Sequence, residues 1–586
     1  MLGDSRFAGY TAGHLKKDLA AGLIVGIVAI PLGMAFAIAS GVRPEYGIYT
    51  VILAGFLVSL LGGSKFQIAG PTGAFVPILF AIVMEHGYEN LLIAGLMSGV
   101  LLVLLGLLRL GSIIRYIPRP VTIGFTAGIA VIIFSGQIAH FLGLRNIKKK
   151  ESFHENMREI AVHLETVNWY SVGTALVCLS VLLLTTRITT KIPGALAGLI
   201  AATLVAVVFF SGKIDTIGST YGEIPSGLPS FQFPALSWDL MVSLLPAALV
   251  ITMLGGIESL LSAMVADRLG GDKHNSNKEL IGQGIANIVT PLFGGIPATG
   301  AIARTATNIK NGAASPVSGM VHALVVLMVL LVFAPYASHI PLAAMAPVLM
   351  FVAWNMSERR EFLHVLKTRT GDSVVLVVTF LLTVFADLTT AVGAGLVLAA
   401  VLFIKRMSGT LHVEGALPDP QDKFVKPHGG GKERACPQIG IFTMEGPLFF
   451  GTSPAFLDSI KETLASGGPQ PILLLRMGRV SDMDTTGEAA LADIADEVKA
   501  RGGTLLLTGI TPVVRHVLDS SGLSARIGEE RLFRRTGEAI AYALTKVSPS
   551  RCSGCRQFTF DECAELSRPA PAPLRKDRTA ASLARG

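Results

Sequence analysis

The chain has 586 residues, of which 51% are hydrophobic and only 15% are charged, whereas soluble domains carry about 25% charged residues. This composition excludes an ordinary soluble enzyme and indicates a membrane protein whose long apolar runs stop near residue 406. The net charge of +8 does not indicate nucleic-acid binding, because most basic residues lie in alternate loops between apolar segments. That distribution is the positive-inside pattern, and it predicts a cytosolic N-terminus.

Residues 1–406 are predicted to form a transmembrane transporter domain built of α-helices. A span needs roughly 20 apolar residues, and a half-helix needs fewer. About fourteen segments meet this criterion, and an even number returns the chain to the cytosol. The predicted spans are 19–40, 45–62, 68–84, 90–108, 120–142, 170–186, 192–211, 241–266, 279–293, 298–310, 315–334, 341–356, 372–387 and 389–405.

Glycine and proline interrupt the third span of each half of this domain. The first break is Ala69-Gly-Pro-Thr-Gly-Ala74 and the second is Pro297-Ala-Thr-Gly-Ala301. Proline removes a backbone donor and glycine loosens a helix, so each break predicts irregular backbone that opens into a half-helix. Seven spans per half, an odd number, place the two halves in opposite orientations, which predicts a 7+7 inverted repeat.

The two half-helix N-termini are expected to converge on an anion, because each carries about +0.5 charge and free N–H groups. Arg304, about one turn into the second half-helix, adds a positive charge. The alternative is that Arg304 only neutralises Glu258. Phe36 in the first span either forms an apolar wall of the site or packs against lipid. The predicted substrate-binding residues are Phe36, Gly70, Thr72, Gly73, Ala74, Thr299, Gly300, Ala301, Ile302 and Arg304.

Glu258 lies in an apolar span, near the predicted middle of the bilayer. An ionised carboxylate is unfavourable there, so such residues face the protein interior and usually mark ion or proton paths. We predict that Glu258 couples transport to a cation, with hydrogen bonds from Ser259 and from Ser262, which lies one turn later on the same helix face. The alternative is a structural carboxylate paired with an arginine.

The soluble part begins with a linker rich in proline and glycine at 407–437, and ends with a tail at 548–586 that is predicted to be disordered. Between them, at 438–547, strand-like and helix-like segments alternate, which predicts a small α/β domain. The predicted strands are 439–450, 471–477 and 504–508, and the predicted helices are 453–465, 487–500 and 512–520.

Two motifs in the soluble part have competing interpretations. Thr485-Thr-Gly-Glu488 fits a capping box at a helix start, although Thr485 or Thr486 could instead be a regulatory phosphorylation site. Cys552 and Cys555 with Cys563 resemble part of a zinc site, but a fourth ligand is missing nearby in the sequence. No phosphate-binding Gly-Lys-Ser/Thr motif occurs, so an ATP-driven pump is not expected, and neither a metal nor a cofactor is predicted.

Several motifs resemble the sulfate permease (SulP) family of anion transporters. They are the segments 29–41, 69–73, 297–306 and 311–319, and the tail module with Asp484-Thr-Thr-Gly487 is similar to the STAS domain of that family. The resemblance implies a 7+7 inverted repeat with core and gate domains, an elevator-like motion, a homodimer, and an anion held between spans three and ten. It also implies that Glu258 takes part in cation coupling.

These observations predict a secondary active transporter, not an enzyme, in a bacterial-type cytoplasmic membrane with its STAS domain in the cytosol. Proton-coupled symport of sulfate is expected, with a C4-dicarboxylate or bicarbonate as alternative substrates. Protons are favoured over sodium because Ala301, Ile302 and Ala303 lack the hydroxyl groups of sodium-coupled relatives. The alternatives are an anion exchanger, a sodium-coupled bicarbonate transporter, or a membrane-anchored regulatory protein in which the STAS domain is the active part.

Overall fold

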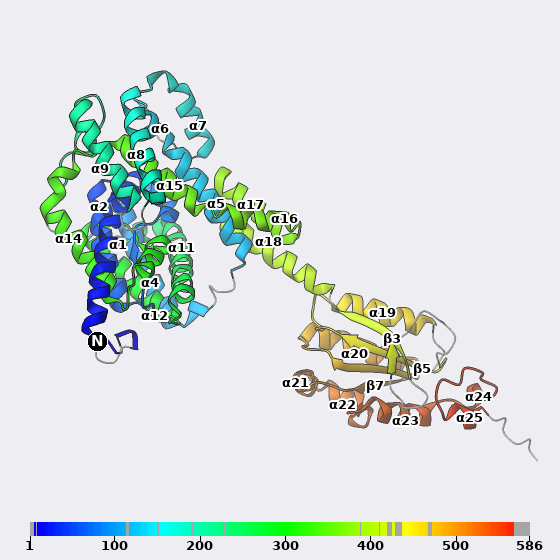
Figure 1. The fold of residues 1–586 in the computed structure, drawn as a ribbon. Coiled ribbons are helices and arrows are strands. Elements are labelled where there is room, and N and C mark those ends of the chain that lie inside the picture. Colours follow the sequence, from blue (N-terminus) through cyan, green and yellow to red (C-terminus); the bar gives the residue numbers. More distant parts are fainter. Residues whose placement is uncertain are drawn as a thin grey trace, which may run out of the picture. The chain divides into compact units, whose positions relative to one another are not determined.

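The computed structural model describes residues 5–7, 9–112, 117–148, 150, 152–188, 193–227, 229–386, 388–409, 411–418, 425–427, 436–466 and 472–567. The chain forms two compact units, Met1–Ala399 and Ala400–Gly586, and each is described by itself. The first unit is almost entirely helical, and the second contains a six-stranded sheet with helices (Figure 1).

The helices of the first unit pack as two bundles. In one bundle α12 packs against α4 and α2, and α14 packs against α1 and α2. Its helices are α1 (Ala12–Ala39), α2 (Pro44–Leu61), α3 (Val76–His86), α4 (Tyr88–Leu107), α11 (Trp238–Gly270), α12 (Ser276–Val289), α13 (Ile302–Lys310) and α14 (Val317–Ala337). They come from two stretches of the chain, residues 12–107 and 238–337, and they form the core domain that the family resemblance predicts.

The second bundle is the gate domain. In it α17 packs against α5, and α15 packs against α5, α8 and α9. Its helices are α5 (Arg119–Gly136), α6 (Ile138–Leu142), α7 (Phe153–Val162), α8 (Trp169–Ile188), α9 (Gly194–Phe209), α15 (Leu342–Met356), α16 (Arg359–Lys367), α17 (Gly371–Phe385) and α18 (Leu388–Ser408). The short helix α10 (Ile217–Tyr221) lies near the start of α15, because the N–H of Ile217 donates a hydrogen bond to the carbonyl of Ile340 at 2.9 Å.

Many of these helices are long and apolar enough to cross a bilayer. Within the described residues there are eight by length and composition: α1, α2, α4, α5 continued by α6, α8, α11, α14 and α18. Three shorter apolar helices end at His86, Phe209 and Phe385. Helices α3, of 11 residues, and α13, of 9 residues, follow the two glycine and proline breaks, as predicted for half-helices.

The sheet of the second unit has the order β4-β3-β5-β6-β7-β8. Strands β5 (Ile439–Glu445), β6 (Ile472–Arg479), β7 (Thr504–Thr508) and β8 (Leu532–Phe533) are parallel, whereas β3 (His412–Pro418) is antiparallel to both β5 and β4 (Val425–Pro427). Successive residues of β6 point to opposite faces. Leu473 and Leu475 join one apolar cluster, and Ile472 and Leu474 join the other.

Helices cover both faces of this sheet. The cluster that contains Leu473 includes residues of α19 (Ser453–Ser466), α20 (Thr485–Ala500), α21 (Pro512–Ser520) and α22 (Leu523–Ile527). The cluster that contains Ile472 includes Ala539, Ile540 and Ala543 of α23 (Thr536–Lys546). The alternation of strands and helices expected from the sequence is therefore present.

The structure differs from the expected domain limits at two places. The expected linker 407–437 contains β3 and β4, because these strands complete the edge of the sheet beside β5. The expected disordered tail begins with α24 (Pro549–Cys552) and α25 (Cys563–Leu566), and Phe560 between them is buried against the sheet. Residues 410, 419–424, 428–435 and 568–586 of these two segments lie outside the described residues.

Candidate anion site

The two Gly/Pro breaks meet in the core domain as a pair of short antiparallel strands. Ala69 in β1 (Ala69–Gly70) faces Gly300, and Gly70 faces Thr299 in β2 (Thr299–Gly300). The N–H of Ala301 continues the pairing by donating to the carbonyl of Ile68 at 2.8 Å. Extended backbone at membrane depth needs such partners, since no water reaches it. The pairing thus joins the third span of each half of the domain.

Two side chains of α12 form hydrogen bonds with the backbone of Ala298 in the second break. The amide of Asn287 donates to the carbonyl of Ala298 at 2.9 Å, and its oxygen accepts the N–H of Ala298 at 2.7 Å. The amide of Gln283 donates to the same carbonyl at 2.6 Å. Proline at 297 prevents a helix here, and these two amides replace the hydrogen bonds that a helix would have supplied.

A helix begins directly after each strand. The short 3-10 helix η2 (Gly73–Phe75) leads into α3, and α13 begins at Ile302. The residues that precede them, Thr72 and Ala301, have extended backbones and make no side-chain capping bond. The first N–H groups of both helices therefore remain available for a ligand, and the two positive helix ends lie beside the paired strands.

Arg304 reaches from α13 to the other half of the site. Its guanidinium is buried, with 3% exposed, and Nη2 donates to the carbonyl of Pro71 at 3.0 Å. The other terminal nitrogen, Nη1, has no hydrogen-bond partner among the described residues and lies 2.7 Å from where a Cβ at Gly70 would be. The guanidinium carbon lies 6.0 Å from the centre of the Phe36 ring. Arg304 therefore presents an unsatisfied cationic donor between the two breaks.

Helix α11 supports β2 with hydroxyl groups. Thr299 donates to the carbonyl of Gly255 at 3.1 Å, and its oxygen lies 2.9 Å from Ser259 Oγ. Ser259 Oγ also accepts the N–H of Gly300 at 3.1 Å. One turn further, Ser262 donates to Thr305 Oγ1 at 3.2 Å. Each hydroxyl is thus used to fix β2 and α13.

Glu258 is buried in α11, with 6% exposed, next to Ser259. No ion pair or hydrogen bond joins it to any described residue, and Arg304 binds Pro71 instead. The alternative in which Arg304 neutralises Glu258 is therefore not what the structure shows. Ser259 and Ser262, which the sequence offered as partners of Glu258, donate elsewhere. An unpaired carboxyl in this position is suited to take up a proton or a cation.

Three further residues face this region and were not selected from the sequence. Gln67, just before β1, is buried with neither its amide oxygen nor its nitrogen bonded to a described residue. Ile133 of α5 and Met356 of α15 belong to the gate domain, and both lie within 3.2 Å of where a Cβ at Gly73 would be. Gln67 could have been noticed as a polar residue beside the first break. The gate residues could not, because only the packing brings them there.

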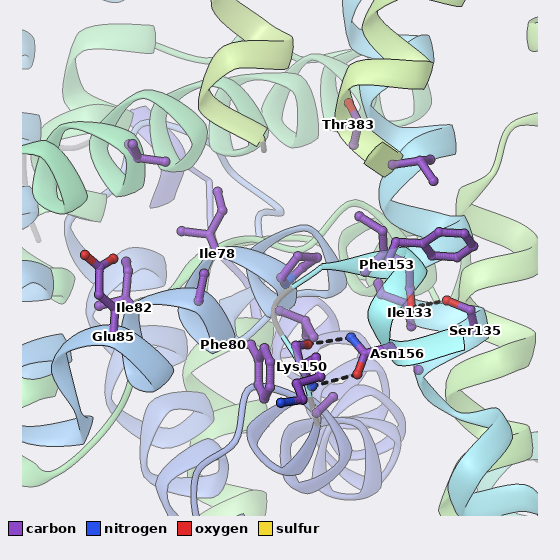
Figure 2. A pocket seen from close by; sticks show the side chains of 18 of the residues that line it. Ile78, Phe80, Ile82, Glu85, Ile133, Ser135, Lys150, Phe153, Asn156 and Thr383 are labelled. Carbon is purple, nitrogen blue, oxygen red and sulfur yellow. Dashed lines mark hydrogen bonds between the residues drawn. The ribbon is translucent and has the colours of Figure 1, made fainter. Parts of the chain in front are cut away.

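A cavity of about 710 Å³ separates core helices α3 and α11 from gate helices α5, α7 and α17 (Figure 2). Ile78, Ile82 and Glu85 project from α3, whereas Ile133, Phe153 and Thr383 lie on the gate side. The walls are mostly apolar. The two bundles are therefore not closely packed along this part of their boundary.

In the second unit, Thr485 and Thr486 are exposed at the start of α20. The capping residue is Asp484 rather than Thr485, because the Asp484 carboxylate accepts the N–H of Gly487 at 2.8 Å. The same carboxylate accepts the N–H of Phe450 at 3.0 Å. The capping box expected from the sequence is therefore not formed, because the third helical residue after Asp484 is Gly487, which has no side chain to complete it.

Comparisons with known proteins identify the family. Residues 15–379 match the sulfate permease family, and residues 434–539 match the STAS domain. The chain belongs to the sulfate permease family. It is an integral membrane protein of a family of sulfate and bicarbonate anion transporters.

Relatives and a solved structure extend the comparison. The chain is 56% identical to "Putative sulfate transporter YvdB" of Bacillus subtilis over 90% of this chain and 98% of that protein. It is 28% identical to the bicarbonate transporter BicA of Picosynechococcus, over 92% and 97% of the two chains. The fold is similar to that of murine Solute Carrier 26 family member A9, an anion transporter in the inward-facing state, with a TM-score of 0.82, 20% identity, and 92% of each chain covered.

Proposed function

We propose that this protein is a proton-coupled symporter that takes up sulfate or a similar divalent oxyanion. The observation that carries the proposal is the Nη1 of Arg304, unpartnered among the described residues and buried between two free helix N-termini. Such a donor set matches an anion that accepts several hydrogen bonds at once. The chain is 56% identical to the relative named as a putative sulfate transporter and 28% identical to the bicarbonate transporter. This difference favours sulfate over bicarbonate as the substrate.

The coupling follows from the charges around the anion. The two helix N-termini contribute about +0.5 each, and Arg304 contributes +1. With Glu258 ionised the local sum is about +1, and with Glu258 protonated it is about +2. A divalent anion therefore binds more strongly when Glu258 carries a proton. Proton and anion then travel together, because each favours the binding of the other.

A proton suits the site better than sodium. Sodium needs several oxygen ligands, and the residues at the start of α13, Ala301 and Ile302, offer no side-chain oxygen. The nearby hydroxyls of Ser259, Thr299 and Ser262 are engaged with one another or with the backbone. Glu258 would remain as a buried carboxylate next to β2, and a proton needs no further ligands to bind it.

The transport step is proposed to be an elevator-like movement of the core bundle against the gate bundle. The paired strands, Arg304 and Glu258 all belong to the core and would move together with the anion. The cavity between α3 and α5 leaves room for the two bundles to shift (Figure 2). Ile133 and Met356 of the gate lie next to Gly73 and would shield one side of the anion.

The protein is proposed to act as a homodimer in a bacterial-type cytoplasmic membrane, with the N-terminus and the STAS domain in the cytosol. Basic residues at the ends of the spans support this orientation. Lys16 and Lys17 lie in the first turns of α1, and Lys405 and Arg406 lie in the last turn of α18.

The experiment that tests the proposal is uptake of labelled sulfate into proteoliposomes under an inward proton gradient without sodium. Fumarate and bicarbonate are offered in parallel. We expect wild-type protein to accumulate sulfate only with the gradient. Glu258→Gln should lose the dependence on the gradient, because an amide cannot release a proton. Glu89→Gln, at the exposed start of α4, is the matched control and should behave like the wild type.

Two outcomes would overturn the proposal in different ways. Gradient-independent uptake that is the same in wild type and in Glu258→Gln would replace symport with anion exchange. Accumulation of fumarate or bicarbonate in place of sulfate would keep the mechanism and change the substrate. If the protein transports none of these anions, a regulatory role of the STAS domain becomes the better explanation.

A further inference from the structure

Four cysteines from two distant parts of the chain line one small cavity in the second unit. Cys552, Cys555 and Cys563 belong to the segment after α23, and Cys436 stands just before β5. The cavity has a volume of about 20 Å³, and all four thiols are free. The sequence alone shows only three of these cysteines together. The fold supplies the fourth.

The sheet brings the two parts together. Gln438, at the start of β5, accepts the N–H of Ser548 at 2.8 Å and donates to the Ser548 carbonyl at 3.3 Å. Phe560 is then buried against Ile439 and Ile441 of the same strand. The segment 548–567 is thus fixed to the start of β5 and to one face of that strand, and Cys436 lines the same cavity as the three later cysteines.

Hydrogen-bond donors surround the sulfur atoms. Gln438 Nε2 donates to Cys552 Sγ at 3.2 Å, and the N–H of Phe560 donates to Cys563 Sγ at 3.4 Å. N–H donors to sulfur stabilise thiolates, and they are the usual outer partners of thiolates that bind a metal.

We propose that Cys436, Cys552, Cys555 and Cys563 bind one zinc ion. Four thiolates in a tetrahedral arrangement are a common structural zinc site, and the pair Cys552 and Cys555 has the two-residue spacing of such sites. Gly554, between them, has φ of +78°, which turns the chain so that both side chains can face the same ion. A zinc ion bound by four thiolates has a net charge of −2. The positive charges of Arg551, which lines the cavity, and of Arg556, which follows Cys555, would partly compensate it.

Binding requires a local closing of the site. Among the described residues, no group of three or more His, Cys, Asp or Glu side chains is already arranged to hold a metal ion. Zinc binding would release the four thiol protons, because the thiolate is the form of cysteine that binds a metal. All four cysteines already line the small cavity, and the proposal requires their side chains to turn toward its centre.

Zinc would fasten a segment that has little other support. The STAS match ends at residue 539, so the three later cysteines lie beyond it. Segment 548–567 contains two helices of four residues each and one buried large side chain, Phe560. Such a short piece buries too little apolar surface to be stable alone, and structural metals commonly replace a core of this kind. Disulfides are the other possible use of the thiols, but the proposed cytosolic location keeps thiols reduced.

The test is the metal content of the full-length protein, purified in detergent without added metal or chelator and measured by mass spectrometry. We expect about one zinc per chain, in line with a single site of four cysteine ligands. Cys436→Ser and Cys555→Ser should each lose most of this zinc. Cys178→Ser is the matched control and should keep its zinc. Cys178 is buried in α8, where its thiol donates a hydrogen bond to the carbonyl of Ala344.

A second measurement covers variants that fold poorly. Removing zinc from wild-type protein with a strong chelator should expose the thiols to alkylation and speed tryptic cleavage at Arg551 and Arg556, and adding zinc back should reverse both. Replacing zinc by cobalt should give the visible bands of a tetrahedral thiolate complex. Metal-free protein with oxidised cysteines would support disulfides and overturn the proposal. Equal zinc in the wild type and both serine variants would also overturn it, as adventitious binding.

Discussion

Arg304 Nη2 donates a 3.0 Å hydrogen bond to the carbonyl of Pro71, so a side chain of the second repeat is held by the backbone of the first. The two residues lie 233 positions apart in the chain. This bond fixes one arm of the guanidinium and leaves the other, Nη1, directed toward Gly70. The arrangement makes the geometry of the anion site sensitive to small changes at either break.

Replacing Arg304 by lysine should weaken sulfate binding by about 10- to 100-fold, which is the usual effect of losing one hydrogen bond to a charged group. Lysine keeps the charge but cannot bond Pro71 and the anion with two fixed arms. The measurement is the sulfate concentration for half-maximal uptake into proteoliposomes. Lys310→Gln, at the exposed end of the same helix, is the control. Unchanged affinity in Arg304→Lys would show that Arg304 does not contact the anion.

Gly70→Ala should reduce uptake at least as strongly as Arg304→Lys. A methyl group at Gly70 would lie 2.7 Å from Arg304 Nη1 and displace the guanidinium from the anion site. Gly173→Ala is the matched control, because a Cβ there meets no atom within 4 Å. Uptake and the yield of monodisperse protein are measured together. A Gly70→Ala protein that folds and transports normally would contradict the proposed position of the anion.

Ser259→Ala should lower the free energy of unfolding by about 1–3 kcal/mol, because the buried N–H of Gly300 would lose its acceptor. Thr299→Val removes a hydroxyl from the same network. The two effects should not add, since both variants break the contact between the two oxygens. Thermal unfolding of the two single variants and the double variant, in detergent, measures this coupling. Strict additivity would show that the contact contributes nothing.

Filling the cavity between the bundles should slow transport without preventing anion binding. Ala247→Phe places a ring from α11 into that space, where it would oppose a shift of the core against the gate. Stabilisation of the protein by sulfate in a thermal assay should remain, whereas the uptake rate should fall. Leu204→Phe, on the exposed side of α9, controls for added bulk. A normal rate in Ala247→Phe would argue against the proposed elevator movement.

Much of this architecture was determined by the sequence itself. Long apolar segments can satisfy their backbone in a bilayer only as helices, so composition located the membrane helices without knowledge of their neighbours. Gly70 with Pro71, and Pro297 with Gly300, interrupt those segments through their own backbone properties, and both half-helices begin where the breaks predict. Strands β5, β6 and β7 also lie where the sequence predicts strands, whereas β3, β4 and β8 were not predicted.

Only the tertiary structure decided which side chains meet. Ser259 and Ser262 bond Thr299 and Thr305 rather than Glu258, and Asp484 rather than Thr485 caps α20. Cys436 joins the three late cysteines because β5 lies beneath their segment. Such contacts depend on the packing of residues far apart in the chain, and helix or strand period carries no information about the partner across the interface.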